Sequence, residues 1–331
     1  MKSDFLKGGL IAKAMLLLST VIWGSTFFII KNALDEIPPF FLLSVRFFFS
    51  ALLLGIICWK KWKLFNREYL WKGALAGVFL ALAYIFQTVG LQHTTPGNNA
   101  FLTTVYCVLV PFMFWGVTRR KPSVFNVAAA VVCVAGIGLV CLDGGGMKFT
   151  FMGEGMTLLC GVFFALQIVA VGVQGKKLDV MLYTVVQFGV AFAVCFLLFL
   201  CTEKFPTSVS SYGVFSLSYV TVVATCLCFV MMNVGIKRTS AASAALILSL
   251  EAVFGVAFSL MFYHERPGAQ TWVGFVVIFA AVLLSEAVPA FYAKRKNAFF
   301  PSLDDVPDLP VYARETYPRG SAENAGTEMS A

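Results

Sequence analysis

Two stretches of the chain, GLQHTTPGNNAFLTT (Gly90–Thr104) and GIKRTSAASAALILS (Gly235–Ser249), resemble one another at an offset of 145 residues. The matched pairs, in order, are Gly90 and Gly235, Thr94 and Thr239, Thr95 and Ser240, and Ala100 and Ala245. Such an echo at a fixed offset indicates an internal repeat. The amino-acid composition of the chain indicates which kind of structure is repeated.

The composition is that of a membrane protein. Hydrophobic residues make up 59% of the chain and charged residues 13%, against about 25% charged residues in a typical soluble domain. A soluble protein with one very large core is a poor alternative, because too few charges remain to cover it. The nine cysteines lie in or beside apolar runs without the paired spacing of a zinc site, so we read them as small buried hydrophobes.

Apolar runs of about 20 residues recur along the chain, and each is long enough to cross a bilayer as a helix. Since backbone groups in hydrocarbon must be satisfied within the segment, helices are the expected structure. We predict an all-α integral membrane protein with ten transmembrane helices. The predicted spans are 11–30, 38–58, 71–91, 98–118, 124–142, 154–174, 181–201, 214–235, 240–262 and 270–290.

The basic residues predict the orientation. Of the 25 Lys and Arg residues, 20 fall on the side of the predicted membrane that carries the N-terminus, and only Lys31, Lys148, Lys204 and Arg266 fall on the other. Positive charge collects on the cytoplasmic side, so both termini are predicted to be cytoplasmic. This placement also explains the net charge of +8 without a nucleic-acid partner.

The echo extends beyond the opening stretches. LLSTVIWGST (Leu17–Thr26) lies over LLCGVFFALQ (Leu158–Gln167) at an offset of 141, and Val45-Arg46-Phe47 lies over Val186-Gln187-Phe188. Five spans are an odd number, so the second copy must enter the membrane from the opposite side, as an inverted repeat. Such repeats serve alternating access; an old duplication without moving parts is the alternative. The predicted organisation is a first repeat at 1–142, an extracytoplasmic connection at 143–153, a second repeat at 154–290 and a disordered cytoplasmic tail at 291–331.

The segments GLQHTTPGNNAFLTTVYCVLVP (Gly90–Pro111) and AALILSLEAVFGVAFSLMFYHERP (Ala244–Pro267) resemble the fourth and ninth helices of EamA-type members of the drug/metabolite transporter superfamily. The resemblance implies ten helices in two inverted halves, frequent assembly as dimers, so that a homodimer is a candidate assembly, and transport of small metabolites. The family often has Glu after the fourth helix, as in His264-Glu265-Arg266-Pro267 of the second half. The first half instead has Arg119-Arg120-Lys121-Pro122.

Two ionisable residues are predicted to lie deep in the membrane, Arg46 in the second span and Glu251 in the ninth. Intramembrane charge usually marks function, but the pair could also neutralise one another or other groups and only join helices. Their counterparts in the repeat are Gln187 and Tyr106, so the halves diverge here. A carboxylate held between burial and a nearby guanidinium can bind a proton in one conformation and release it in another, so Glu251 is also the predicted coupling residue.

Polar and aromatic residues line the predicted helix faces around these charges, at spacings of three and four residues that share a face. Each alone is more often an interhelical hydrogen bond than a ligand contact. Together they predict an aromatic-walled, mostly uncharged substrate site. The predicted substrate-binding residues are Trp23, Thr26, Arg46, Tyr84, Gln87, Asn99, Tyr106, Gln167, Gln187, Asn233 and Glu251.

An enzyme would need parts that the sequence lacks. Its two histidines, His93 and His264, are both near predicted outer loops, and no metal-binding cluster, phosphate loop or nucleophile–base pair is present. We therefore expect no catalytic residue, metal or cofactor. The leading hypothesis is a secondary transporter in the cytoplasmic membrane that exports a small polar metabolite, such as an amino acid. An intramembrane enzyme and a non-transporting structural membrane protein are the alternatives.

Overall fold

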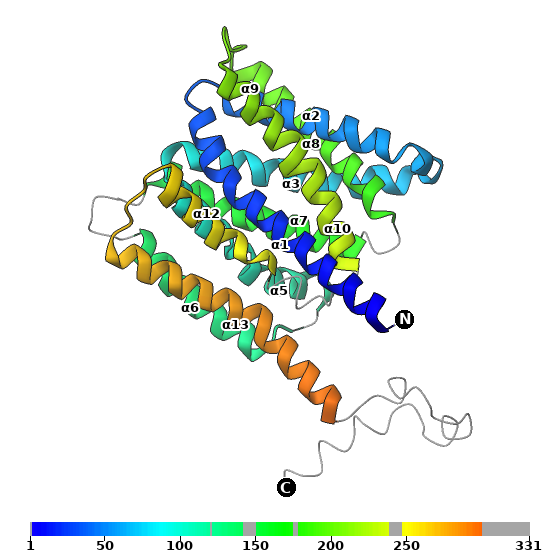
Figure 1. Ribbon diagram of the computed structural model, residues 1–331, viewed down its shortest axis with the longest axis vertical. Helices are drawn as coiled ribbons and strands as arrows, with labels where there is room; N and C mark the ends of the chain where they lie inside the picture. Colours follow the sequence, from blue (N-terminus) through cyan, green and yellow to red (C-terminus); the bar gives the residue numbers. More distant parts are fainter. Residues whose placement is uncertain (1, 120, 142–149, 175–177, 238–246, 300–331) are drawn as a thin grey trace. The chain divides into compact units, whose positions relative to one another are not determined.

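The computed structural model describes residues 2–119, 121–141, 150–174, 178–237 and 247–299, and these residues contain helices and no strand (Figure 1). The chain divides into two compact units, Met1–Ala287 and Val288–Ala331. The predicted spans all lie in the first unit except the end of the last.

Among the described residues, each predicted span contains helix. In the first half these are α1 (Lys2–Ala33), α2 (Pro39–Ile57), the short 3-10 helix η1 (Trp59–Leu64), α3 (Arg67–His93), α4 (Pro96–Thr103), α5 (Val105–Thr118) and α6 (Val124–Cys141). The fourth predicted span thus consists of two helices that meet at Thr104.

The second half repeats this order with more irregular helices. Its elements are the π-helix η2 (Phe151–Gly155), α7 (Met156–Gln174), α8 (Val180–Thr202), α9 (Ser211–Ser218), the π-helix η4 (Tyr219–Leu227), α10 (Cys228–Lys237), α12 (Leu250–Phe262) and α13 (Ala269–Phe299). Residues 238–246, which include the start of the predicted ninth span, lie outside the described residues. Helix α13 continues to Phe299, so 291–299 is helical rather than part of a disordered tail; residues 300–331 lie outside the described part.

Seven of these helical segments are long and apolar enough to cross a membrane, by length and composition. They correspond to the predicted spans 1–4 and 6–8. The other three predicted spans coincide with the shorter apolar helices Val124–Val140, Leu250–Phe262 and Ala269–Ser285. A multi-pass helical membrane protein is therefore confirmed, whereas the count of ten crossings and the orientation stay predictions.

Gly90 and Gly235, the first residues of the two matching stretches, each allow a close contact between helices. A Cβ atom on Gly90 of α3 would come within 2.5 Å of Thr157 Oγ1 on α7. A Cβ atom on Gly235 of α10 would come within 2.6 Å of Leu16 Cγ on α1. Leu16 and Thr157 themselves correspond at the offset of 141 residues. The glycines are therefore required by two equivalent close helix contacts, one in each half.

Other contacts respect the same equivalence. Helices α2 and α8 are counterparts and lie antiparallel, since Phe41 contacts Phe199 and Phe47 contacts Phe188. Helices α3 and α7 are antiparallel as well: Gly90 lies at Thr157, and Tyr84 lies at Phe164.

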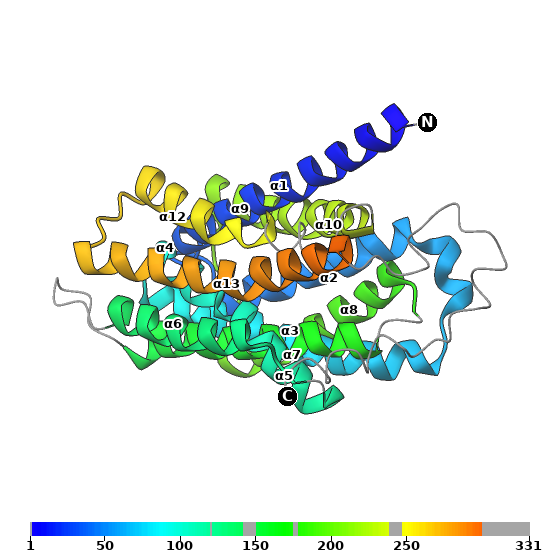
Figure 2. The ribbon, with the colours of Figure 1, turned by 90° about the horizontal axis from the view of Figure 1, so that it is seen from below.

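The helices at the rim form a separate pair. Helices α6 and α13 lie side by side (Figures 1 and 2), and a Cβ atom on Gly136 of α6 would come within 2.7 Å of Ile278 on α13. Asn126 Nδ2 of α6 donates a hydrogen bond to Ser285 O of α13, at 3.2 Å. Such amide contacts tie membrane helices that bury little polar surface otherwise.

The ends of counterpart helices also match. The non-glycine residues with positive φ among those described are Arg119 (φ 61°) and His264 (φ 54°), which correspond at the offset of 145 residues. Each follows the helix of its half, α5 or α12, in the left-handed conformation that ends a helix.

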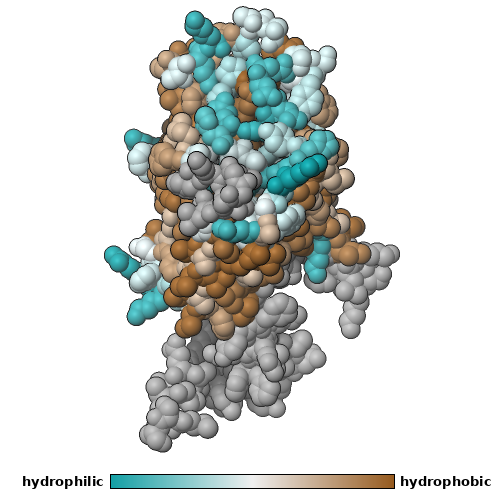
Figure 3. All heavy atoms as spheres, turned by 90° about the vertical axis from the view of Figure 1, so that its left-hand side faces the viewer, coloured by the Kyte–Doolittle hydropathy of each residue, from teal (hydrophilic) through white to brown (hydrophobic). Residues whose placement is uncertain are grey.

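Figure 3 shows the side of the molecule where α1 ends and α13 begins. Hydrophilic residues gather in the upper part of this face, and hydrophobic residues lie below them.

We expect Gly90→Ala to lower the free energy of unfolding by about 1–3 kcal/mol, because the added methyl group overpacks the contact with α7. The matched control is Gly138→Ala in α6, where nothing lies within 4 Å of the added Cβ atom. There the better helix propensity of Ala predicts a neutral or slightly stabilising effect of up to about 1 kcal/mol. Thermal unfolding of both variants in one detergent measures the difference; equal midpoints would contradict the close contact.

Candidate functional site

The side chain of Arg46 is the best-defined part of the candidate site. It projects from α2 into the interior and is 2% exposed. Its Nε donates to Thr225 Oγ1 at 2.8 Å and its Nη2 to Tyr84 Oη at 3.3 Å. The guanidinium carbon also lies 4.4 Å from the centroid of the Tyr84 ring, within cation–π range. Arg46 therefore joins α3 of its own half to η4 of the other.

The partner on the second half sits in a π-helix. Within η4, the Thr225 hydroxyl donates to Val220 O at 2.7 Å, five residues earlier, and accepts from Arg46. π-helical turns often mark functional positions, since they shift side chains out of the regular register. Here the shift turns one threonine hydroxyl toward the buried guanidinium.

Aromatic rings from both halves surround this cluster. The Tyr84 ring meets Phe47 and Phe164 edge-on, with centroids 5.3 and 5.2 Å away. Phe164 also lies 6.1 Å from Tyr106, and Trp23 meets Phe229 edge-on at 5.9 Å. The predicted residues Trp23, Tyr84 and Tyr106 therefore each take part in ring contacts between helices; their role in substrate binding stays a prediction.

Predicted polar residues satisfy one another across helices. Gln87 Nε2 donates to Thr103 Oγ1 at 3.3 Å. Asn99 Nδ2 donates to Gln87 O at 3.2 Å and to Thr157 Oγ1 of the second half at 2.8 Å. Among the described residues the buried Asn99 Oδ1 accepts no hydrogen bond, so this amide keeps one acceptor for another group.

Four predicted residues lie apart from Arg46 in their contacts. Gln167 Nε2 donates to Gln187 Oε1 at 2.8 Å, so the two glutamines join α7 to α8. Trp23 Nε1 donates to Ala224 O at 2.6 Å, and the Thr26 hydroxyl donates to Trp23 O at 2.7 Å. For Asn233 the backbone is helical, but its side chain lies outside the described part of the chain.

Glu251 differs from all of these. It lies in the first turn of α12 and is half-buried, and within the described residues its carboxylate makes no hydrogen bond or ion pair. It is within electrostatic range of Arg46 and Tyr84. Within the described residues Arg46 donates its hydrogen bonds to neutral hydroxyls and forms no ion pair with Glu251. Whether the two charges nevertheless serve only to neutralise one another or other groups stays an open alternative.

The structure has a cavity away from the predicted site residues. A cavity of about 230 Å³ on the side of α2 and α8 is lined by Phe41, Ser44, Val45, Phe48, Phe49, Phe192 and Phe196. None of the predicted site residues borders it. Around Arg46 the aromatic side chains pack against one another. Groups of three or more His, Cys, Asp or Glu residues that could hold a metal do not occur in the described part.

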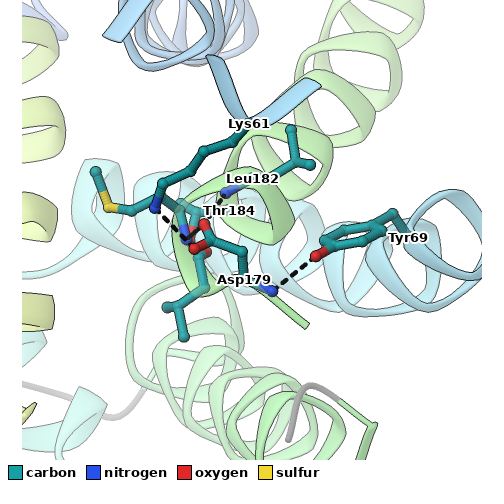
Figure 4. A network of polar contacts seen from close by, with 7 residues as sticks. Lys61, Tyr69, Asp179, Leu182 and Thr184 are labelled. Atoms are coloured by element: carbon teal, nitrogen blue, oxygen red, sulfur yellow. Dashed lines mark hydrogen bonds and ion pairs between the residues drawn. The ribbon is translucent and has the colours of Figure 1, made fainter. Parts of the chain in front are cut away.

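One end of the two halves is joined by an ion pair (Figure 4). Lys61 Nζ lies 2.7 Å from Asp179 Oδ2, and the Asp179 backbone N–H donates to the Tyr69 hydroxyl at 2.8 Å. Asp179 also accepts from Met181 N and Leu182 N at the start of α8. Partial burial opposes ionisation of Asp179, but the bonds from Lys61 and from these N–H groups outweigh it, so the pKa of this carboxyl is lowered. This end carries the predicted cytoplasmic loops, and we call it the inner end.

Known proteins resemble the chain over most of its length. A family model described as the EamA-like transporter family matches residues 10–142 and 151–286. An uncharacterized transporter of Archaeoglobus fulgidus is 31% identical over 275 residues, which are 82% of this chain and 84% of the relative. A second one from the same organism is 26% identical over 282 residues, 82% of this chain and 96% of the relative. One solved structure matches with a TM-score of 0.59 over 83% of this chain and 96% of its own, at 14% identity, a likeness of fold alone.

We expect Thr225→Val to destabilise the protein by about 1.5–3 kcal/mol, because it removes a hydrogen bond to a buried charge. Thr221 supplies the matched control on the same π-helix: its hydroxyl is buried and has no hydrogen-bond partner in the part of the chain that the structure describes. Thr221→Val should therefore be neutral or stabilising. Thermal unfolding in detergent compares them, and an equal loss in both variants would show that the Arg46 bond contributes nothing.

The lowered pKa of Asp179 predicts a pH effect of defined sign. Its contribution to stability is present above the unfolded-state value of about 3.9 and is lost as the pH falls through the lower folded-state value. Asp179→Asn should reduce stability at pH 7 and remove part of the stability loss of the native protein on acidification. Unfolding midpoints between pH 7 and pH 3 test this; parallel curves for both proteins would contradict it.

Proposed function

Because the chain belongs to the EamA-like transporter family, we propose that it is a secondary transporter that exports a small polar metabolite across the cytoplasmic membrane by alternating access. Amino acids and related compounds are the proposed substrate class. The membrane location rests on the apolar helices; the substrate class, direction and mechanism are our proposal.

The observation that carries the proposal is the bonding of Arg46. A buried guanidinium is costly in a membrane interior, and a protein that only spans the bilayer has no need of one. Arg46 donates its hydrogen bonds to the hydroxyls of Tyr84 and Thr225, one from each half. Such neutral partners can be exchanged for a substrate carboxylate, which binds a guanidinium more strongly than a hydroxyl does.

The arrangement of counterpart helices supports alternating access. Helix α2 is antiparallel to its counterpart α8, as two inverted halves require. Equivalent glycine contacts between α3 and α7 and between α10 and α1 give the halves equivalent packing surfaces. Two halves that pack in equivalent ways can exchange conformations, which would open a central site to each side in turn.

Glu251 is the proposed coupling residue. Its carboxylate makes no hydrogen bond or ion pair in the described residues, while it lies within electrostatic range of Arg46. A carboxylate without fixed partners can take up a proton or an ammonium group without first breaking other bonds. We assign Arg46 to the anionic group of the substrate, and Glu251 to a proton or to the cationic group.

We expect Glu251→Gln to leave folded protein in the membrane, lower transport by about tenfold and flatten its pH dependence, since coupling of about 1.4 kcal/mol corresponds to that factor. The measurement is flux of a panel of amino acids and related metabolites in proteoliposomes, with and without imposed proton and sodium gradients.

Glu68→Gln is the matched control, because Glu68 is exposed and pairs with Lys72 at the inner end; it should transport as the native protein does. Normal flux and an unchanged pH profile in Glu251→Gln would leave Glu251 as a packing residue. Absence of flux for every substrate and gradient with the native protein would count against transport itself.

A further inference from the structure

The opening repeat contains the turn Thr94–Gly97, in which Thr94 and Thr95 join α3 to α4 and Pro96 and Gly97 begin α4. This turn is hydrogen-bonded to the second half of the chain. Thr94 Oγ1 donates to Glu154 Oε1 at 2.6 Å. Thr95 Oγ1 donates to Glu265 Oε1 at 2.5 Å, and Gly97 N donates to Glu265 Oε2 at 3.0 Å. One four-residue turn therefore supplies three hydrogen bonds to two carboxylates from separate elements. We call this end of the halves the outer end.

Both carboxylates are buried and have neutral partners. Glu154 is 4% exposed and Glu265 is 8% exposed. Glu154 also accepts from Thr150 N at 2.8 Å and from the Thr150 hydroxyl at 3.1 Å, and Glu265 also accepts from the Ser259 hydroxyl. No Lys, Arg or His lies within ion-pair distance of either in the described ranges. The carboxylates are thus stabilised by donors of which half belong to the turn.

The turn is also fitted closely to Glu265. A Cβ atom on Gly97 would come within 2.7 Å of Glu265 Oε2, so glycine is needed for the carboxylate to reach the backbone. His264 takes its left-handed conformation directly before Glu265, which turns the chain at the end of α12. The left-handed backbone of His264 and the absence of a side chain at Gly97 thus both favour the contact between Glu265 and the turn.

We propose that Thr94–Gly97 is the outer gate of the protein and that Glu154 and Glu265 latch it shut in this conformation. The proposal rests on alternating access as the proposed function. Burial of a carboxylate costs desolvation that its hydrogen bonds offset. When the turn leaves, each carboxylate exchanges those bonds for water, so the closed and open arrangements stay close in free energy, as a gate requires.

The latch belongs to one end only. At the offsets of 141 and 145 residues, the counterparts of Glu154 and Glu265 are Lys13 and Arg120. Both counterparts are basic, so the sequence provides no carboxylates that could bind the counterpart turn at Thr239–Ser240 in the same way. The inner end is joined by the Lys61–Asp179 ion pair instead. Removing charge from Glu154 or Glu265 should consequently shift the population toward the outward-open state and no other.

The test is a distance measurement by double electron–electron resonance. Spin labels on His93→Cys and Arg266→Cys, both exposed positions beside the latch, report its opening in a background with Cys141→Ser and Cys201→Ser. We expect Glu265→Gln and Glu154→Gln to raise a longer-distance population severalfold over the same labelled protein without them. Asp35→Asn, a change at a carboxylate that is exposed rather than buried, is the control and should not raise it.

Unchanged distance distributions in both glutamine variants would overturn the latch, as would an equal shift in Asp35→Asn. Should a glutamine variant fail to fold, Ser259→Ala and Thr94→Val each remove one donor hydroxyl and should give a smaller shift of the same sign; no shift in either would also overturn it. Flux measured on the same proteins separates the two proposals. A shift without any transport by the native protein refutes the proposed function alone, and native transport without a shift refutes the latch alone.

Discussion

A lipid bilayer offers no partner for a polar group, and this constraint governs the whole molecule. Backbone groups are satisfied by helices, and polar side chains must find one another across helices. Asn99 with Thr157, Gln167 with Gln187, and Arg46 with Thr225 are all solutions of this kind. Because many of these bonds join different halves, each one that breaks during a conformational change must be replaced by water, substrate or another residue.

The equivalence of the halves is close where helices touch and weak where chemistry is expected. Gly90 and Gly235 make corresponding contacts with Thr157 and Leu16, and a larger residue at either glycine would separate the helices. The counterpart of Arg46, by contrast, is Gln187, which bonds to Gln167 rather than to a tyrosine and a threonine. Equivalent packing contacts keep the two halves similar in structure. A single site between the halves, by contrast, needs different chemical groups on its two sides.

The sequence predicted the helices well because apolar runs and repeated glycines are local signals. It also identified Arg46 and its aromatic surroundings, since a charge within an apolar run is conspicuous. It did not predict the partners of Arg46, because the register shift that presents Thr225 arises in a π-helix without a sequence signature. The contacts of Glu154 and Glu265 with one turn were not predicted for another reason: charged residues at helix ends are expected at the membrane surface, and only the fold brings both to Thr94–Gly97.

These findings bear on how a substrate would enter the site. In this conformation Arg46 is buried under aromatic rings and bonded to neutral hydroxyls, whereas Glu251 is half-buried and has no such partners among the described residues. A substrate that first met Glu251 would not have to break a bond of the protein, but one that first met Arg46 would have to displace Tyr84 or Thr225. The cationic end of a zwitterion is then expected to bind before its anionic end. Capture of the carboxylate by Arg46 would release η4 from α2, so substrate binding itself would loosen a contact between the two halves.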